Sequence, residues 1–138
     1  MSAEDILAVH DLANRYTDAA NRTDIDGMIA VYAPDGELEA FGNVFKGHAA
    51  LREAFTAGVG TMELMNQVCS SPLIRIDGDR ATARWNITEF ARKKGSETLD
   101  LFIGNYEDEM VRVSGGWAFA RRRLTRRTQL RADVAFRK

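Results

Sequence analysis

The stretch that decides the fold of this chain is EDEMVRVSGGWAFARRR, residues 107–123. The run Ser114-Gly115-Gly116 at its centre predicts a tight turn, and residues that pair across such a turn have numbers that sum to about 230. Three consecutive acidic residues then face three consecutive arginines, in the pairs Glu107–Arg123, Asp108–Arg122 and Glu109–Arg121. Apolar residues flank the middle pair on both strands. We therefore expect Asp108 and Arg122 to form a buried ion pair that is costly to break.

The rest of the chain divides into a helical first part and a strand-rich second part. Helical spacing of apolar residues indicates helices near 6–20, 25–32 and 48–58, with a small hairpin over 37–45 that turns at Gly42-Asn43. Strand-like segments follow at 62–75, 80–92, 99–113 and 117–130, separated by glycine-containing turns. Helices followed by an antiparallel meander are typical of an α+β fold. Strands this long must bend, so we expect one domain over 1–138: a cone-shaped curved antiparallel sheet, or α+β barrel, with three N-terminal helices enclosing a pocket.

Composition excludes several classes of protein. The 138 residues carry 19 basic and 20 acidic side chains and are 45% hydrophobic, which is ordinary for a globular domain. The start of the chain lacks the apolar region of a secretory signal, and no run has the roughly 18–20 apolar residues of a membrane span. Together with the lone Cys69, this predicts a cytoplasmic protein with no membrane partner. The isolated His10 and His48 do not form a metal-ligand cluster, and no cofactor is expected.

The charge is unevenly distributed, because residues 110–138 hold nine basic side chains against the single Asp133. The hairpin accounts for three of these. The remainder are Arg112 and five residues that the predicted pairing leaves unmatched, namely Arg126, Arg127, Arg131, Arg137 and Lys138. These five either bind an anionic group of a substrate or form a solvated basic tail. Basic residues interleaved with stacking aromatics are lacking, so nucleic acid is not an expected partner.

Several short motifs resemble those of the SnoaL-like proteins, which belong to the nuclear-transport-factor-2-like superfamily. They occur in the same order and at the same spacing along nearly the whole chain: Tyr16, Asn21, Asp26, Tyr32 to Gly36, Lys46 to Leu51, Ile76 to Ala81, Tyr106 to Asp108 and Gly115 to Trp117. The resemblance implies a cone-like α+β barrel, a homodimer and a pocket for a hydrophobic small molecule. It does not specify the chemistry, because this fold carries many reactions and some proteins that only bind.

The resemblance also implies which positions would hold an acid and a base. In the dehydratase branch of the superfamily, which includes scytalone dehydratase and bile acid 7α-dehydratase, an Asp follows the first helix and a His lies on the first long strand. In this chain the Asp position falls on Asn21, and the His position falls on Gln67, or on Asn66 if the strand carries a bulge. Neither Asn nor Gln titrates near neutral pH, so neither can replace that pair as a general base.

The comparison with steroid isomerases leads to the same result. Tyr16 matches the tyrosine that donates a hydrogen bond to the substrate oxygen, but the carboxylate base position falls on Ala40 and the second acid on Gly104. Glu39 lies one residue from that base position. A shift of one residue would turn it toward the pocket, yet Leu38 and Ala40 have the character of the inward pair, so Glu39 is expected to face solvent.

We therefore expect a small-molecule-pocket protein. If it is an enzyme, it is a cofactor-independent lyase, isomerase or cyclase that acts on a hydrophobic cyclic substrate through hydrogen bonds from Tyr16, Asn21 and Gln67. Alternatively, Tyr16 is a core tyrosine and the two amides satisfy each other. In that case the chain is a non-catalytic ligand-binding or interaction member of the same fold.

Five further residues are expected to contact the substrate: Tyr32, Trp85, Glu89, Tyr106 and Arg126. The segment 81–89 alternates between apolar and polar residues, and Glu89 continues its apolar face. Glu89 is either the acid or base of a new mechanism, with its pKa raised by an apolar setting, or a rim residue paired with Arg92 or Lys93. Cys69 is expected to be a small core residue rather than a nucleophile.

Overall fold

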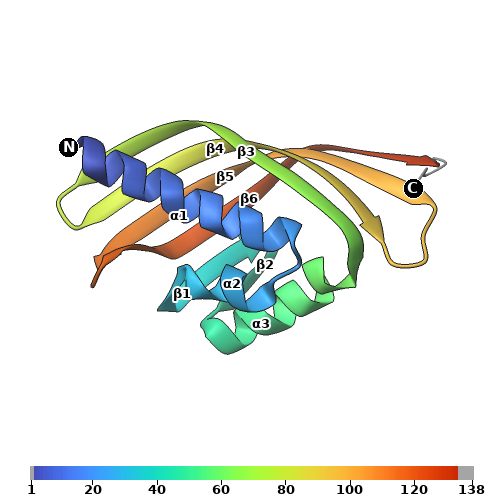
Figure 1. Ribbon diagram of the computed structural model, residues 1–138, viewed down its shortest axis with the longest axis horizontal. Helices are drawn as coiled ribbons and strands as arrows, with labels where there is room; N and C mark the ends of the chain where they lie inside the picture. Colours follow the sequence, from blue (N-terminus) through green and yellow to red (C-terminus); the bar gives the residue numbers. More distant parts are fainter. Residues whose placement is uncertain (1, 134–138) are drawn as a thin grey trace.

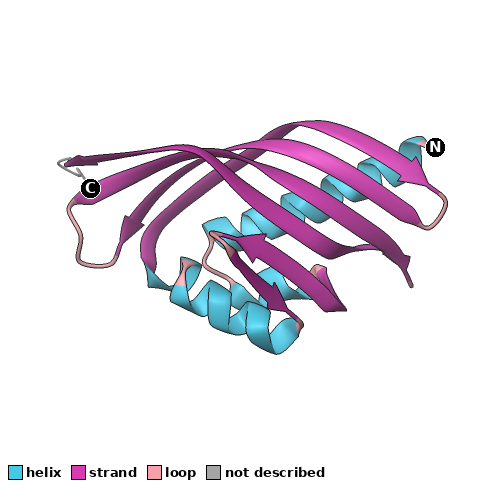
Figure 2. Cartoon of the chain, turned by 180° about the vertical axis from the view of Figure 1, so that it is seen from behind, coloured by secondary structure: helices cyan, strands magenta, loops and turns pink. Residues whose placement is uncertain are grey.

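A computed structural model describes residues 2–133. Its centre is a six-stranded curved sheet in the order β2-β1-β6-β5-β4-β3. The helix α1 (Ala3–Asn21) lies along one face of this sheet, and α2 (Ile25–Ala30) and α3 (His48–Ala57) cover one end of the same face (Figure 1). The opposite face of the long strands is not covered by a helix of the described chain (Figure 2). The α+β fold is thus confirmed, with an open sheet whose edges are β2 and β3.

The first two helices, α1 and α2, each begin at a side-chain cap. The hydroxyl of Ser2 accepts a hydrogen bond from the Asp5 backbone N–H (3.1 Å), and the Asp24 carboxylate accepts one from the Gly27 N–H (3.0 Å). These caps satisfy donors that the first helical turn leaves unpaired. A short 3₁₀ turn (Val59–Thr61) follows α3 and leads into the meander.

The long strands occur where the sequence predicts them: β3 (Met62–Asp77), β4 (Arg80–Lys93), β5 (Thr98–Val113) and β6 (Gly116–Asp133). The small hairpin is also present, as β1 (Tyr32–Ala40) and β2 (Asn43–Lys46). Its turn residues are Phe41 and Gly42, with φ of 52° and 79°, so the turn lies one residue earlier than predicted.

The second helix is shorter than predicted. It ends at Ala30, and Tyr32 is already in β1, where it pairs with Phe119 of the parallel neighbour β6. The Phe119 backbone N–H donates to the Val31 carbonyl at 2.9 Å. The helical spacing that includes Tyr32 is overridden here by strand pairing with a segment almost 90 residues away, which local periodicity does not reveal.

The hairpin register of β5 and β6 is confirmed for all three predicted pairs, 107–123, 108–122 and 109–121. Arg122 binds Asp108 through two hydrogen bonds, Nε to Oδ1 at 2.7 Å and Nη2 to Oδ2 at 2.9 Å. Both side chains are fully buried. Burial would lower the pKa of Arg122, but the Asp108 carboxylate more than compensates, so the pKa is raised and the guanidinium stays charged.

The outer two arginines behave differently from the prediction. Their side chains turn mainly to β1 rather than to β5. Arg121 pairs with Glu37 (3.3 Å) and Glu39, while Arg123 pairs with Glu39 (2.9 Å) and only distantly with Glu107 (3.6 Å). Glu39 therefore faces away from the cavity, as predicted, and hydrogen bonds from Arg123 and Arg121 lower its pKa.

Replacement of either member of the Asp108–Arg122 pair should strongly destabilise the fold. Asp108→Leu or Arg122→Met alone leaves one charge buried without its partner and should cost about 3–5 kcal/mol of unfolding free energy. The double variant removes both charges and should cost far less than the sum of the two single changes. Urea denaturation of the four proteins measures this coupling, and additive losses would show that the pair is not a unit.

Candidate functional site

A cavity of about 450 Å³ lies between the helices and the inner face of the sheet. Its walls are mainly apolar and come from α1, α2, α3, the β1–β2 hairpin and the four long strands. Buried wall residues include Leu38, Ala40, Phe55, Met65 and Phe102. A concave, largely apolar chamber with a few polar groups has the general form of a small-molecule site.

The polar groups form a connected row inside this cavity. The Gln67 side chain donates from Nε2 to Glu89 Oε1 at 3.1 Å and lies 3.3 Å from the Tyr106 hydroxyl. The Tyr16 ring lies next in the row, edge-on to the Tyr106 ring with the ring centres 6.0 Å apart. Gln67 is 4% exposed, and its Oε1 has no hydrogen-bond partner among the described residues. Because a buried polar atom without a partner is costly, this atom is available to a polar group of a ligand.

Glu89 is the ionisable group of the row. It lies directly opposite Gln67 in the β3–β4 register and lines the cavity. Burial raises its pKa, and the hydrogen bond from Gln67 only partly offsets this effect. Of the two basic residues that were alternative partners for Glu89 at the rim, Arg92 pairs with Glu63 at 3.0 Å. No carboxylate of the described residues lies within ion-pair distance of Lys93.

Asn21 is close to Gln67 but has a different role from the one the sequence suggests. Its Nδ2 donates to the Gln67 carbonyl oxygen (3.0 Å), and its Oδ1 accepts from the Gln67 backbone N–H (2.6 Å). Both functional atoms of the amide are thus used by the backbone of β3, and Asn21 does not line the cavity. The end of α1 is in this way fastened to the strand that carries Gln67.

The tyrosines of the site are held protonated. Burial raises the pKa of Tyr16 and raises that of Tyr106 further, while the positive charge of Arg122 acts in the opposite direction on both. The Arg122 guanidinium carbon lies 4.6 Å from the centre of the Tyr16 ring and 3.8 Å from that of Tyr106. A neutral phenol in an apolar setting can donate a hydrogen bond to a developing negative charge.

Two residues expected to contact the substrate lie elsewhere. Tyr32 is buried against the rings of Tyr16 and Phe119, and Trp85 is buried beneath α1, edge-on to His10 at 5.3 Å. Neither lines the cavity. Alternation identified the inner face of β4 correctly, but which part of that face α1 covers depends on tertiary packing.

Cys69 packs against the core, and burial raises the pKa of its thiol to about 11, so it is not a reactive nucleophile.

The mouth of the cavity is basic, as expected for a last strand that passes it. Arg126 and Arg131 of β6 line this end together with Lys93. The prediction that Arg131 is unmatched is wrong, because it pairs with Asp100 at 2.7 Å. Arg127 points to the other side of the sheet, and Arg137 and Lys138 lie outside the described residues.

Phe41, which the sequence patterns do not mark as a site residue, lines the cavity from the tip of the β1–β2 turn. It is 61% exposed, although it is a large apolar residue. A usable signal was present, since an aromatic residue directly before a glycine in a tight hairpin occupies a position that Asn or Asp usually fills.

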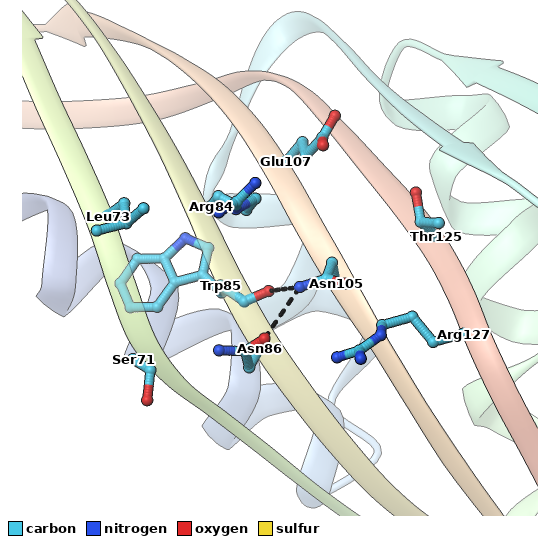
Figure 3. Close-up of a pocket in the computed structure, with 9 residues that line it drawn as sticks. All are labelled: Ser71, Leu73, Arg84, Trp85, Asn86, Asn105, Glu107, Thr125 and Arg127. Atoms are coloured by element: carbon cyan, nitrogen blue, oxygen red, sulfur yellow. Dashed lines mark hydrogen bonds between the residues drawn. The ribbon is translucent and has the colours of Figure 1, made fainter.

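A second hollow, of about 380 Å³, lies on the outer face of the sheet (Figure 3). It is lined mainly by polar side chains, among them Arg84, Asn86, Asn105 and Arg127. Asn105 donates from Nδ2 to the Trp85 carbonyl and to Asn86 Oδ1, both at 3.1 Å. The few apolar atoms here offer little to a hydrophobic ligand, so the inner cavity is the better candidate site.

Residues 2–133 contain neither a candidate metal centre nor a helix that could span a membrane. No group of three or more His, Cys, Asp or Glu side chains there is placed to hold a metal ion. The helices of this part of the chain lack the combination of length and apolar character needed to cross a bilayer. His48 lies with its Nε2 at 3.0 Å from the Tyr32 carbonyl, a structural contact.

Fold and cavity together define an α+β protein with an internal, largely apolar cavity. A model of the SnoaL-like domain matches residues 1–123, and the chain belongs to this family. None of the curated proteins matches the sequence. The resemblance inferred from the motifs is confirmed.

Solved structures support the same fold. A protein of unknown function from Mycobacterium tuberculosis is 28% identical, with a TM-score of 0.82 over 91% of this chain and 77% of that one. A hexachlorocyclohexane dehydrochlorinase of type 2 is 15% identical, with a TM-score of 0.87 over 99% and 98%. A ketosteroid isomerase-like protein from Erwinia carotovora atroseptica is 22% identical, with a TM-score of 0.79 over 92% and 99%.

Replacing Glu89 by Gln should make the protein more stable above neutral pH. The folded protein holds the Glu89 proton to higher pH than the unfolded chain, whose carboxyl has the ordinary pKa of 4.5. The stability of the wild type therefore falls as pH rises from that value through the raised pKa. Gln cannot ionise and keeps the contact with Gln67, so the variant escapes this loss.

Thermal unfolding of both proteins from about pH 4 to pH 8 measures the effect. The melting temperatures should agree at the acidic end and diverge toward the alkaline end, with Glu89→Gln higher. A constant difference across this range would show that the pKa of Glu89 is not raised by folding.

Proposed function

We propose that this SnoaL-like protein is a cofactor-independent enzyme, of the isomerase or lyase class, that moves a proton on a hydrophobic cyclic substrate. The observation that carries the proposal is the position of Glu89. Of the two carboxylates that line this largely apolar cavity in the described chain, Asp100 is paired with Arg131, whereas Glu89 accepts a hydrogen bond from the Gln67 amide, which also contacts the Tyr106 hydroxyl. A raised pKa brings a carboxyl group closer to neutral pH, where it can both accept and donate a proton.

The cavity residues have complementary roles in this chemistry. Ionised Glu89 removes a proton from a carbon next to a substrate carbonyl, and the electron pair moves onto the carbonyl oxygen. The hydroxyls of Tyr16 and Tyr106 donate hydrogen bonds to that oxygen, where the negative charge develops. Gln67 uses both N–H groups of its amide to orient Glu89 and Tyr106. Collapse of this intermediate then either returns the proton to another carbon, which is isomerisation, or expels a leaving group, which is elimination.

Asn21 takes part indirectly. Since both atoms of its amide bind the Gln67 backbone, it acts as a positioning residue that holds Gln67 at the cavity. The acid and base of the dehydratase branch are replaced by amides at 21 and 67, and in this proposal Glu89 supplies the missing titrating group from the neighbouring strand. Two structural relatives are a dehydrochlorinase and a ketosteroid isomerase-like protein, and these classes are compatible with such proton chemistry.

Exchange of substrate protons with solvent tests the proposal without knowledge of the natural substrate. A panel of cyclic ketones is incubated with the protein in D₂O, and deuterium uptake at the carbon next to the carbonyl is followed by NMR. The wild type should accelerate uptake into some members, and Glu89→Gln should lower that rate by about 10²–10⁴-fold. Glu53→Gln, on the exposed side of α3, is the matched control and should leave the rate unchanged.

The pH dependence of the same rate gives a second readout. It should rise with pH through a group whose pKa lies above the ordinary carboxyl range, and this rise should be lost in Glu89→Gln. Binding of ring compounds without any exchange would instead favour a non-catalytic ligand-binding protein. The use of the Asn21 amide by the backbone is the observation that favours this second function.

We also propose that two copies pair through the outer face of the sheet. Val68, Leu73 and Phe90 are exposed there, and arginines and glutamates such as Arg84 and Glu107 alternate, which allows the face to complement a second copy of itself. Light scattering should give twice the chain mass for the wild type and the mass of one chain for Val68→Glu/Leu73→Glu. A wild type with the mass of one chain at micromolar concentration would contradict the pairing.

A further inference from the structure

The mouth of the cavity has an excess of positive charge. Three cationic side chains line it, Lys93, Arg126 and Arg131, against one carboxylate, Asp100. Asp100 is bound to Arg131 at 2.7 Å. Among residues 2–133, no carboxylate lies within ion-pair distance of Lys93 or Arg126. The elements that form the cavity thus leave two positive charges at its opening without a counterion.

Arg126 is held by an aromatic ring instead of by an acid. Its guanidinium carbon lies 4.7 Å from the centre of the Phe41 ring and 6.0 Å from that of Phe102. Stacking on an aromatic ring orients a guanidinium but leaves its N–H donors, which lie in the plane of the guanidinium, free to bind other groups. Arg126 is therefore oriented at the mouth and retains its capacity to bind an anion through two hydrogen bonds.

The position of Phe41 lowers the stability of the fold. It is 61% exposed and occupies the first turn position between β1 and β2 with φ of 52°, a conformation that bulky residues seldom adopt. An Asn at this position, before Gly42, would suit the turn better and would expose no apolar ring. Neither the conformation of the turn nor packing in the core requires an aromatic side chain at position 41. The Phe41 ring instead contacts Arg126 and forms part of the cavity wall.

We propose that the ligand of this cavity is an apolar molecule that carries an anionic group at its outer end, and that Arg126, stacked on Phe41, binds this group. The inference rests on the proposed function only in taking the inner cavity as the ligand site. The apolar body of the ligand lies against Leu38, Phe55 and Phe102, and its inner end reaches Gln67. Lys93 adds a second positive charge at the opening.

A pair of fluorescent probes tests the charge directly. 1-Anilinonaphthalene-8-sulfonate and N-phenyl-1-naphthylamine share the same apolar rings, and only the first carries an anion. The wild type should bind the sulfonate more tightly. Arg126→Gln should weaken binding of the sulfonate by about fivefold or more and leave the neutral probe within about twofold of wild type.

Arg127→Gln is the matched control. Arg127 is the next residue of β6 and carries the same charge, but it lines the outer hollow (Figure 3). The variant should bind both probes as the wild type does. Raising the salt concentration from about 50 mM to 500 mM should weaken binding of the sulfonate probe to the wild type and have little effect on its binding to Arg126→Gln.

The outcomes separate this inference from the proposed function. Equal binding of the two probes by the wild type, or equal losses in Arg126→Gln and Arg127→Gln, overturns the anion site alone. Failure of both probes to bind the wild type overturns the cavity as a ligand site and with it the proposed function. The rate of proton exchange in Glu89→Gln tests only the proposed proton transfer by Glu89 and does not depend on the anion site.

Phe41→Asn gives an independent check of the aromatic wall. Because Asn-Gly suits the turn, the variant should unfold at a higher temperature than the wild type. It should nevertheless bind both probes more weakly, and the sulfonate most, since Arg126 loses the ring on which it is stacked. A more stable variant that binds both probes as the wild type does would overturn the role of Phe41.

Discussion

The buried ion pair between Asp108 and Arg122 is the constraint on which the rest of the structure depends. Two charges without access to water are tolerated only in the one register of β5 against β6 that joins them. Because side chains alternate along a strand, that register also decides that Tyr106 faces the helices and that Arg126 reaches the cavity mouth. The same guanidinium packs on Tyr16 and Tyr106, so the ion pair connects the sheet to α1 and supports the floor of the site.

Several residues that border the cavity lower the stability of the fold. Glu89, the unpartnered Gln67 oxygen and exposed Phe41 each lower the stability of the fold, and each borders the cavity. Such features persist where function uses them. The cavity is thus polar at its floor, apolar along its walls and positive at its mouth, and the ligand proposed above would match it with its inner end, its apolar body and its anionic group in that order.

Much of the fold could be predicted because its signals are local. Alternation and glycine turns placed the four long strands within a few residues, and the acidic and basic runs determined the hairpin pairing. The second helix was extended too far because the pairing of Tyr32 with Phe119 is a long-range contact. The arginines at 121 and 123 were assigned to β5 for the same reason, since the sequence did not show that β1 would pair with β6 in parallel.

For the site, the sequence by itself determined that Tyr16, Glu89 and Tyr106 face inward, because a period of two or of 3.6 residues marks a face. Gln67 was placed there by the family resemblance, with Asn66 as the alternative. Only the tertiary structure decided what each inward residue meets. The packing of α1 covers Trp85 and leaves Glu89 open to the cavity, and it brings Asn21 to the Gln67 backbone. Periodicity specifies the side of an element, whereas the depth of a side chain and its partners are set by the elements that pack on that side.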